Sequence, residues 1–167
     1  GYTRGRSEKG NPAKLDHNSG KFVYESTNDG ENWNKLNQIP FGGDYFSNIS
    51  VNISTFPKAI IYVCIIDRVP STTDILKVYT NNAWFERSSG LPAGKYIRTV
   101  RPALNTENTA YALTNGYSPG AKIFKTTNRG INWRNISGDI PDIPLSDIIP
   151  HPTDSNKLYL GSYLGFF

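Results

Sequence analysis

An eight-residue phrase occurs twice in this chain, about one hundred residues apart. Residues 26–33 read STNDGENW and residues 126–133 read TTNRGINW, with Gly and Trp at the same places in both. A shorter variant, TNNAW, spans residues 80–84. The tryptophans therefore recur at intervals of about 50 residues: Trp33, Trp84 and Trp133. A period of this length indicates a chain built from several copies of one small unit.

Each unit contains four short segments of the kind that forms β-strands. The run before each tryptophan alternates apolar and polar residues, as in KFVYEST, ILKVYT and KIFKTT. Two further families of segments precede it, one with AIIYVCII and TAYALTNG and one with SNISVNIS and IRTVRPAL. Short alternating runs bounded by Gly, Pro, Asn and Ser predict antiparallel strands. Four such strands per repeat predict an all-β fold, a partial β-propeller of four-stranded antiparallel blades.

The repeat also predicts the organisation of the domain. Residues 1–167 are expected to belong to one propeller domain, with part of a blade at 1–38, blades at 39–88 and 89–138, and the start of the next at 139–167. Residues 4–19 are interpreted as a loop insertion. Propellers close with four or more blades, so the chain is expected to be an excerpt or to assemble with the remaining blades of the same or a partner chain. A first residue that is Gly and the absence of Met agree with an excerpt.

Composition excludes several function classes. The net charge is +4, from 18 Lys and Arg against 14 acids, and no run of five like charges indicates nucleic-acid binding. No apolar stretch reaches about 18 residues, which argues against membrane insertion. Cys64, the single cysteine, is expected to be a small buried hydrophobe rather than a nucleophile or ligand. No metal and no cofactor are expected.

The repeated phrase resembles the Asp-box, or BNR repeat, with the pattern Ser/Thr-x-Asp-x-Gly-x-Thr-Trp. Asn replaces the Asp in both full copies, and the middle copy lacks the Gly and two residues. The matching positions are Ser26, Asn28, Gly30 and Trp33, then Thr80 and Trp84, then Thr126, Asn128, Gly130 and Trp133. The similarity to sortilin-like and xyloglucanase-like propellers covers almost the whole chain. It implies a propeller fold and an extracellular or cell-surface location, whereas the functions of box-containing proteins range from sialidases to receptors.

The residue types of the box have a structural explanation. Gly30 and Gly130 are expected to supply the positive φ of a tight turn. Asn28 and Asn128 are expected to bond main-chain amides in an Asx-turn. Each indole is expected to pack beneath its turn, with its N–H on a carbonyl, in like surroundings at every tryptophan. On this basis Trp33→Ala or Trp133→Ala would cost about 3–5 kcal/mol.

The resemblance also implies where ligands bind. Boxes lie on the face away from the ligand, which directs attention to residues 3–21, 67–74 and 115–121 and to the inter-blade segments 40–48, 91–98 and 139–147. Aromatic side chains among Lys and Arg suit sugars, extended peptides or an acidic partner surface. The candidate ligand-binding residues are Tyr45, Phe46, Arg68, Tyr96, Arg98, Tyr117 and Tyr163.

Catalysis has weaker support. Glycoside hydrolysis needs two facing carboxylates, for which Asp44 and Asp147 are the weak candidates, and Tyr163 stands where the xyloglucanase-like family has an Asp. The Arg-Ile-Pro phrase of sialidases is absent. His17 and His151 are isolated in the sequence, which argues against a triad or a metal site.

The sequence therefore predicts a non-catalytic extracellular propeller module that binds protein or polysaccharide or takes part in surface assembly. The alternatives are a fragment of a glycoside hydrolase with catalytic acids partly outside this piece, and a rigid spacer in a cell-surface assembly. NIS sequons at Asn48, Asn52 and Asn135 occur at about the frequency expected by chance. They do not decide between these functions.

Overall fold

The computed structural model describes residues 22–40, 48–54, 60–66, 76–104, 106–163 and 165–166. The chain divides into two compact units, Gly1–Gln38 and Ile39–Phe167. All strand pairs in the described ranges are antiparallel and no helix occurs there, so the predicted all-β class is confirmed. No helix within those ranges is therefore long and apolar enough to span a membrane.

The described part of the first unit, residues 22–38, contains the hairpin of β1 (Tyr24–Glu25) and β2 (Asn34–Lys35). Tyr24 lies opposite Lys35 and Glu25 opposite Asn34. The loop between the strands is the first copy of the repeated phrase. All four strand residues are exposed, so the hairpin depends on its loop chemistry rather than on a core of its own.

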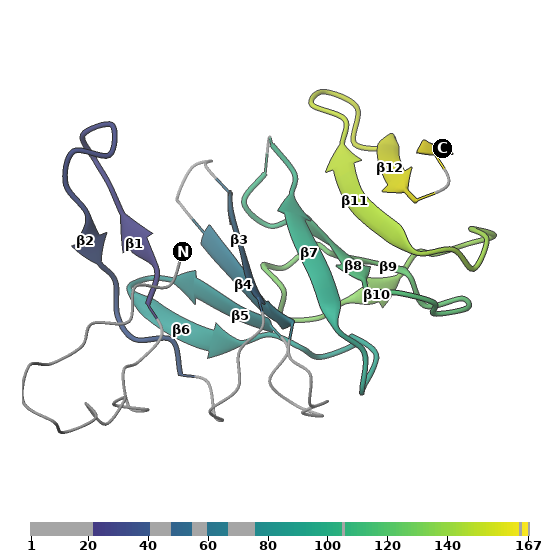
Figure 1. Cartoon of the computed structure of the whole chain (residues 1–167), viewed down its shortest axis with the longest axis horizontal. Coiled ribbons are helices and arrows are strands. Elements are labelled where there is room, and N and C mark those ends of the chain that lie inside the picture. Colours follow the sequence, from purple (N-terminus) through teal and green to yellow (C-terminus); the bar gives the residue numbers. More distant parts are fainter. Residues whose placement is uncertain are drawn as a thin grey trace, which may run out of the picture. The chain divides into compact units, whose positions relative to one another are not determined.

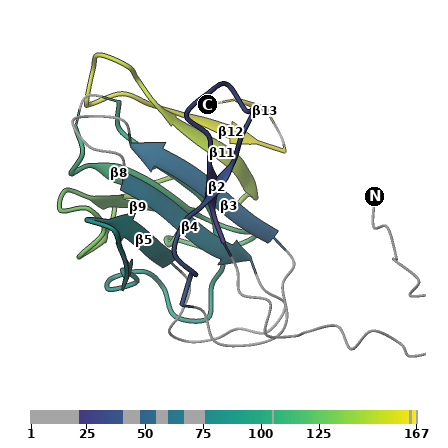
Figure 2. The same ribbon diagram turned by 90° about the vertical axis from the view of Figure 1, so that its left-hand side faces the viewer.

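The second unit begins with a four-stranded sheet whose strands follow chain order. Its strands are β3 (Asn48–Ser54), β4 (Ile60–Ile66), β5 (Leu76–Thr80) and β6 (Ala83–Glu86). Figure 2 shows β3, β4 and β5 adjacent to one another across this sheet. Asn81 and Asn82 join β5 to β6 with φ of 51° and 60°, the pattern of a two-residue type I′ turn, in which Asn is favoured.

Two further sheets continue the same meander. One contains β7 (Ile97–Pro102), β8 (Ala110–Thr114), β9 (Ile123–Thr126) and β10 (Arg134–Asn135). The other contains β11 (Leu145–Pro150), β12 (Leu158–Ser162) and β13 (Gly165–Phe166). The first strand of each carries an irregularity at the same place, between Ile97 and Thr99 and between Leu145 and Asp147. The two sheets therefore repeat in register as well as in strand order.

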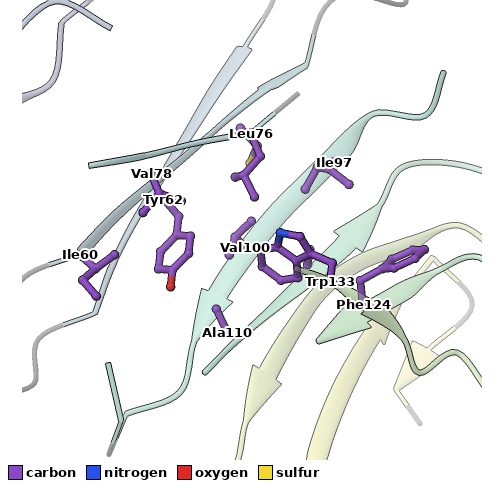
Figure 3. Close-up of a cluster of buried hydrophobic side chains, with 11 residues drawn as sticks. Ile60, Tyr62, Leu76, Val78, Ile97, Val100, Ala110, Phe124 and Trp133 are labelled. Atoms are coloured by element: carbon purple, nitrogen blue, oxygen red, sulfur yellow. The ribbon is translucent and has the colours of Figure 1, made fainter. Parts of the chain in front are cut away.

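The middle sheet is covered on both faces (Figure 1). One cluster, shown in Figure 3, joins the sheet β3–β6 to one face of β7–β10. It contains Ile60, Tyr62, Cys64, Leu76 and Val78 against Ile97, Val100, Ala110, Ala112, Phe124 and Trp133. A second cluster joins the other face to β11–β13 and contains Tyr111, Leu113 and Ile123 against Leu145, Ile148 and Leu160. Every residue of β8 is buried as a result, and Cys64 is a buried free thiol, as expected.

A tyrosine marks the same ladder position in all three sheets. Tyr62 lies opposite Asn52, Tyr111 opposite Arg101 and Tyr159 opposite Ile149. The side chain of Tyr62 is 0% exposed and that of Tyr111 is 2% exposed, because in each case the following sheet covers it. Tyr159 is 51% exposed, as the described residues provide no further sheet over it. Burial raises the pKa of Tyr62 to about 12, although Arg129 and Arg87 oppose the shift.

Candidate functional site

The candidate site lies where the second unit gathers its loops opposite the box turn. Residues 115–122 precede β9 and residues 127–133 follow it, so the two loops lie at opposite ends of one strand. The connection 136–144 reaches the same end as residues 115–122, since the backbone N–H of Ser118 donates to Asp142 Oδ1 at 2.9 Å. We call this region the loop end: residues 95–98, 115–122, 136–147 and 163.

An ion pair between a buried lysine and an exposed aspartate anchors the loop end. Lys122 is 1% exposed, and its Nζ lies 2.7 Å from Asp142 Oδ1 and donates to the carbonyl of Ile143 at 2.9 Å. A buried ammonium needs such partners, because desolvation is costly. The hydrogen bond from Lys122 holds the pKa of Asp142 below its ordinary value, although desolvation opposes this shift; the hydrogen bond from the Ser118 amide lowers the pKa further. The pair ties two loops that are distant in sequence.

A serine completes the anchor. Ser137 Oγ accepts hydrogen bonds from the backbone N–H groups of Lys122 at 2.8 Å and Ile123 at 3.0 Å. The same hydroxyl donates to Asn135 Oδ1 at 2.6 Å, and Asn135 Nδ2 donates to the Gly120 carbonyl at 2.6 Å. The sequon residue Asn135 thus has a structural role in this loop. Sequence reasoning missed Lys122, Asp142 and Ser137, because their partners lie far along the chain and no local pattern marks them.

Two predicted tyrosines project from this anchored frame. Tyr117 is 67% exposed and neighbours Ser118, which is bonded to Asp142. Tyr163 is 71% exposed, and its N–H donates to the Pro144 carbonyl at 3.4 Å. Both tyrosines are therefore held through the short segment 142–144. Tyr96 is half-buried and accepts a bond from the Asn115 N–H through its carbonyl at 2.9 Å.

The predicted Arg98 and Asp147 belong to a second group of contacts between β7 and β11. Arg98 Nε donates to the Ser146 carbonyl at 3.2 Å. Arg101 forms a two-pronged pair with Asp147, with Nε to Oδ1 at 3.0 Å and Nη2 to Oδ2 at 2.7 Å. The Ile148 N–H also donates to Asp147 Oδ1 at 2.8 Å. The first strands of neighbouring sheets are thus joined by charge and by main-chain contacts.

This environment fixes the charge of Asp147. Partial burial alone would raise the pKa of its carboxyl, but the hydrogen bonds from Arg101 and Ile148 and the charges of Arg101 and Arg98 outweigh it and lower the pKa. The same hydrogen bond raises the pKa of Arg101. A catalytic acid needs the opposite shift, so that it keeps a proton near neutral pH. Asp147 is therefore suited to an ion pair rather than to proton donation.

The box turns have one hydrogen-bond network in two copies. The hydroxyl of Thr126 donates to Asn128 Oδ1 at 2.9 Å and accepts the Gly130 N–H at 2.9 Å, while Asn128 Oδ1 accepts the Asn132 N–H at 3.0 Å. In the first copy the Ser26 hydroxyl donates to Asn28 Oδ1 at 3.1 Å and accepts the Gly30 N–H at 2.8 Å. Asn28 Oδ1 accepts the Asn32 N–H at 3.0 Å. Asn therefore performs the expected main-chain bonding in both turns.

Backbone conformation matches as well. Gly30 and Gly130 have φ of 88° and 83°, as the turn requires. The residues before them, Asp29 and Arg129, are also left-handed, with φ of 53° and 59°. Sequence reasoning assigned positive φ to the glycines alone. Arg129 adds a contact of its own, an ion pair with Glu107.

The expectation that all tryptophans share like surroundings is wrong. Trp133 is 5% exposed. Its indole Nε1–H donates to the Arg87 carbonyl at 2.8 Å, and its backbone N–H donates to the Ser89 carbonyl at 2.9 Å. It thereby links its sheet to the segment after β6. Trp33 lies beneath Gly30 in the same way, yet it is 62% exposed, because two short strands cannot enclose an indole.

Trp84 corrects the alignment of the middle copy. Three residues separate Thr80 from Trp84, against six between Thr126 and Trp133. Trp84 therefore enters β6 opposite Tyr79, and the two rings lie 4.9 Å apart. Thr80 ends β5 opposite Ala83 instead of opening a box. The middle segment is thus a type I′ hairpin without the box turn, and Trp84 is half-buried.

Four candidates lie outside the described residues: Asp44, Tyr45, Phe46 and Arg68. His151 lies in a turn, where its Nδ1 accepts the Asp154 N–H at 3.0 Å. Within the described ranges, no group of three or more His, Cys, Asp or Glu side chains is arranged to hold a metal ion. The arrangement at the loop end offers exposed aromatic faces on a rigid frame, which suits binding.

Comparison with known proteins gives no assignment. No family model, no curated protein and no solved structure matches the chain.

Proposed function

We propose that the chain is part of an Asp-box β-propeller that acts at the cell surface or outside the cell as a non-catalytic binding module. The support for the ring architecture is the repeated sheet. The sheets β7–β10 and β11–β13 share strand order and the irregularity of the first strand, and each covers the tyrosine at the same ladder position of the sheet before it. Stacking of antiparallel sheets through both faces is the way in which propeller blades are joined.

The observation that carries the binding function is the loop end. Tyr117 and Tyr163 are the most exposed of the large hydrophobic side chains in the described residues, and both are tied to residues 142–144. Exposed aromatic side chains on a fixed backbone lose little entropy on binding, which favours recognition of a ligand surface. Lys95 adds positive charge nearby, and this charge helps to lower the pKa of Asp142. This chemistry favours a sugar or an extended peptide with acidic groups.

The ion pair of Asp147 supports a non-catalytic role. With its carboxylate held by Arg101 and its pKa lowered, Asp147 is a poor proton donor at neutral pH. A glycosidase would need a second carboxylate, one of the two being kept protonated. Binding without turnover is therefore the better proposal for this part of the chain.

The proposal also requires partners for the sheets themselves. Tyr159 occupies the position that is covered in the other two sheets but is 51% exposed. In a complete ring a further blade, from the same or a partner chain, would cover it.

The test uses the whole chain against a glycan array and a library of acidic and neutral peptides, with reducing-sugar release measured in parallel. Tyr117→Ala and Tyr163→Ala should each abolish most binding to the ligand identified. Tyr159→Ala is the matched control, since it removes an exposed tyrosine away from the loop end, and it should bind like the wild type. Retained binding in both loop-end variants, or release of reducing sugar that Asp147→Asn abolishes, would refute the proposal.

A further inference from the structure

Two like charges face each other at the base of the second box turn. Lys125 in β9 lies opposite Arg134 in β10. Like charges at directly opposite positions of an antiparallel pair are destabilising. In the part of the chain that the structure describes, no carboxylate lies within 4.0 Å of either cation. Lys125 Nζ lies 5.5 Å from the centre of the Tyr111 ring, which positions the ammonium without neutralising it.

These cations line a pocket of about 400 Å³. Its other lining residues are Thr127, Asn128, Asn132 and Trp133, and none of the six is acidic. Asn128 Oδ1 is occupied by Thr126 and Asn132, so the amino group of Asn128 is what that side chain offers to a ligand. Trp133 also borders the pocket, and its indole N–H already donates to the Arg87 carbonyl. The pocket thus presents donors and positive charge.

The other hairpins show that the charge pair is not needed for the turn. In the first box, which has the same hydrogen-bond network, the corresponding positions carry Glu25 opposite Asn34. In the hairpin β5–β6, Lys77 lies opposite Glu86 and the two form an ion pair of 2.8 Å. Only the hairpin β9–β10 among these sets two cations face to face. A structural requirement of the hairpin therefore does not account for them.

We propose that this pocket, on the box side of the sheet, binds a sulfate group, either free or carried on a sugar. Arg134 would contact two oxygens through its planar guanidinium, Lys125 would supply the second charge, and Thr127 and Asn128 would donate hydrogen bonds. The site lies at the opposite end of β9 from the loop end. It does not depend on the function proposed there.

The test follows the amide and indole signals of the isotopically labelled full chain by NMR. Sodium sulfate is added at constant ionic strength, with sodium chloride as the reference salt, and a sulfated disaccharide is then compared with its unsulfated parent. Sulfate should shift the signals of Thr127, Arg134 and the Trp133 indole in a saturable manner that chloride does not reproduce. Tighter binding of the sulfated sugar than of inorganic sulfate would identify the glycan-borne group as the ligand, and equal binding would identify the free ion.

Variants decide whether the pocket is responsible. Arg134→Gln and Lys125→Gln should each weaken sulfate binding by about tenfold or more, with the Trp133 indole signal retained as evidence that the hairpin is intact. Lys157→Gln, which removes an exposed cation on the loop between β11 and β12, should bind sulfate like the wild type. Equal responses to sulfate and chloride, or unchanged affinity in both pocket variants, would overturn the proposal.

Discussion

At the scale of single residues, the hydroxyl group of the first residue of each box, Ser26 or Thr126, accepts a hydrogen bond that should contribute to stability. Thr126 accepts the N–H of Gly130, which is buried, whereas Ser26 accepts the N–H of Gly30, which is exposed. The two bonds are nearly equal in length, at 2.9 and 2.8 Å. Their contributions to the free energy of unfolding should nevertheless differ, because water cannot replace the lost acceptor of a buried N–H group.

We therefore expect Thr126→Val to lower the free energy of unfolding by about 1–3 kcal/mol. Ser26→Ala should cost less than about 1 kcal/mol, since water replaces the lost acceptor. Urea unfolding followed by far-UV circular dichroism measures both values, and Thr126→Ser is the conservative control that retains the hydroxyl. Equal losses in Thr126→Val and Ser26→Ala would contradict the assignment of a buried bond.

The ion pair between Arg101 and Asp147 predicts a dependence of stability on pH. The folded-state pKa of Asp147 lies below its ordinary value of 3.8, so the pair contributes fully above that value and is lost as the pH falls through the folded pKa. Both side chains are more than one third exposed, which limits the contribution to about 1 kcal/mol or less.

Unfolding free energies measured between pH 2 and pH 6 for the wild type and Asp147→Asn test this expectation. The difference between the two proteins should be present near pH 6 and disappear at the acid end. Asp154→Asn, which removes an exposed carboxylate paired with Lys157, serves as the control. A constant difference across the range would show that Asp147 acts through packing and not through its charge.

At the scale of elements, the sequence predicted strand order better than it predicted the environment of the tryptophans. Periodicity reports which strands exist, and the four-strand meanders are present as expected. Burial depends on the neighbouring element, which local pattern does not reveal. Trp33 and Trp133 lie in nearly identical turns, yet Trp133 is 5% exposed and bonded to residues 87 and 89, whereas Trp33 is 62% exposed. The equal cost expected for their replacement by Ala is therefore revised: Trp33→Ala should cost clearly less.

The contact between Trp133 and the segment after β6 depends on a glycine. A Cβ at position 90 would lie 2.1 Å from the Trp133 carbonyl oxygen, and Gly90 has φ of 86°. Gly94 has φ of 68° but no atom within 4 Å of such a Cβ. The two glycines therefore share the strain of a left-handed conformation and differ in the steric clash.

Gly94→Ala should cost about 1–2 kcal/mol from conformation alone. Gly90→Ala should cost a further 1–3 kcal/mol, because the main chain of Trp133 must move. Thermal and urea unfolding compare the two variants, and the NMR signal of the Trp133 indole reports local displacement. Equal destabilisation in both variants would mean that the close approach at Gly90 is absent.

The loop end shows the same limit of sequence reasoning. Exposure of Tyr117 and Tyr163 follows from their place in turns, and both were predicted as ligand-side residues. The anchor formed by Lys122 and Asp142 was not, because a lysine in an alternating run is ordinarily interpreted as a solvated position. Its partner lies in another loop, and only the folded arrangement of β9 and the connection 136–144 brings the pair together.

At the scale of the whole molecule, the described strands of the second unit form a stack of sheets, each covering the one before. Three tyrosines occupy the same ladder position in the three sheets. Tyr62 and Tyr111 are covered by the following sheet, and Tyr159 is not. Because the residue type and the ladder position are the same, we attribute the difference in the exposed fraction of these side chains to the presence or absence of a covering sheet.

The most direct measurement is the free energy of unfolding of Tyr62→Ala, Tyr111→Ala and Tyr159→Ala under one set of conditions. The stack predicts losses of about 3–5 kcal/mol for the two buried tyrosines, as for other large aromatic side chains removed from a core. It predicts less than about 1 kcal/mol for Tyr159, whose side chain remains half in water. Similar losses at all three positions, or a larger loss at Tyr159 than at Tyr111, would contradict the stack of sheets.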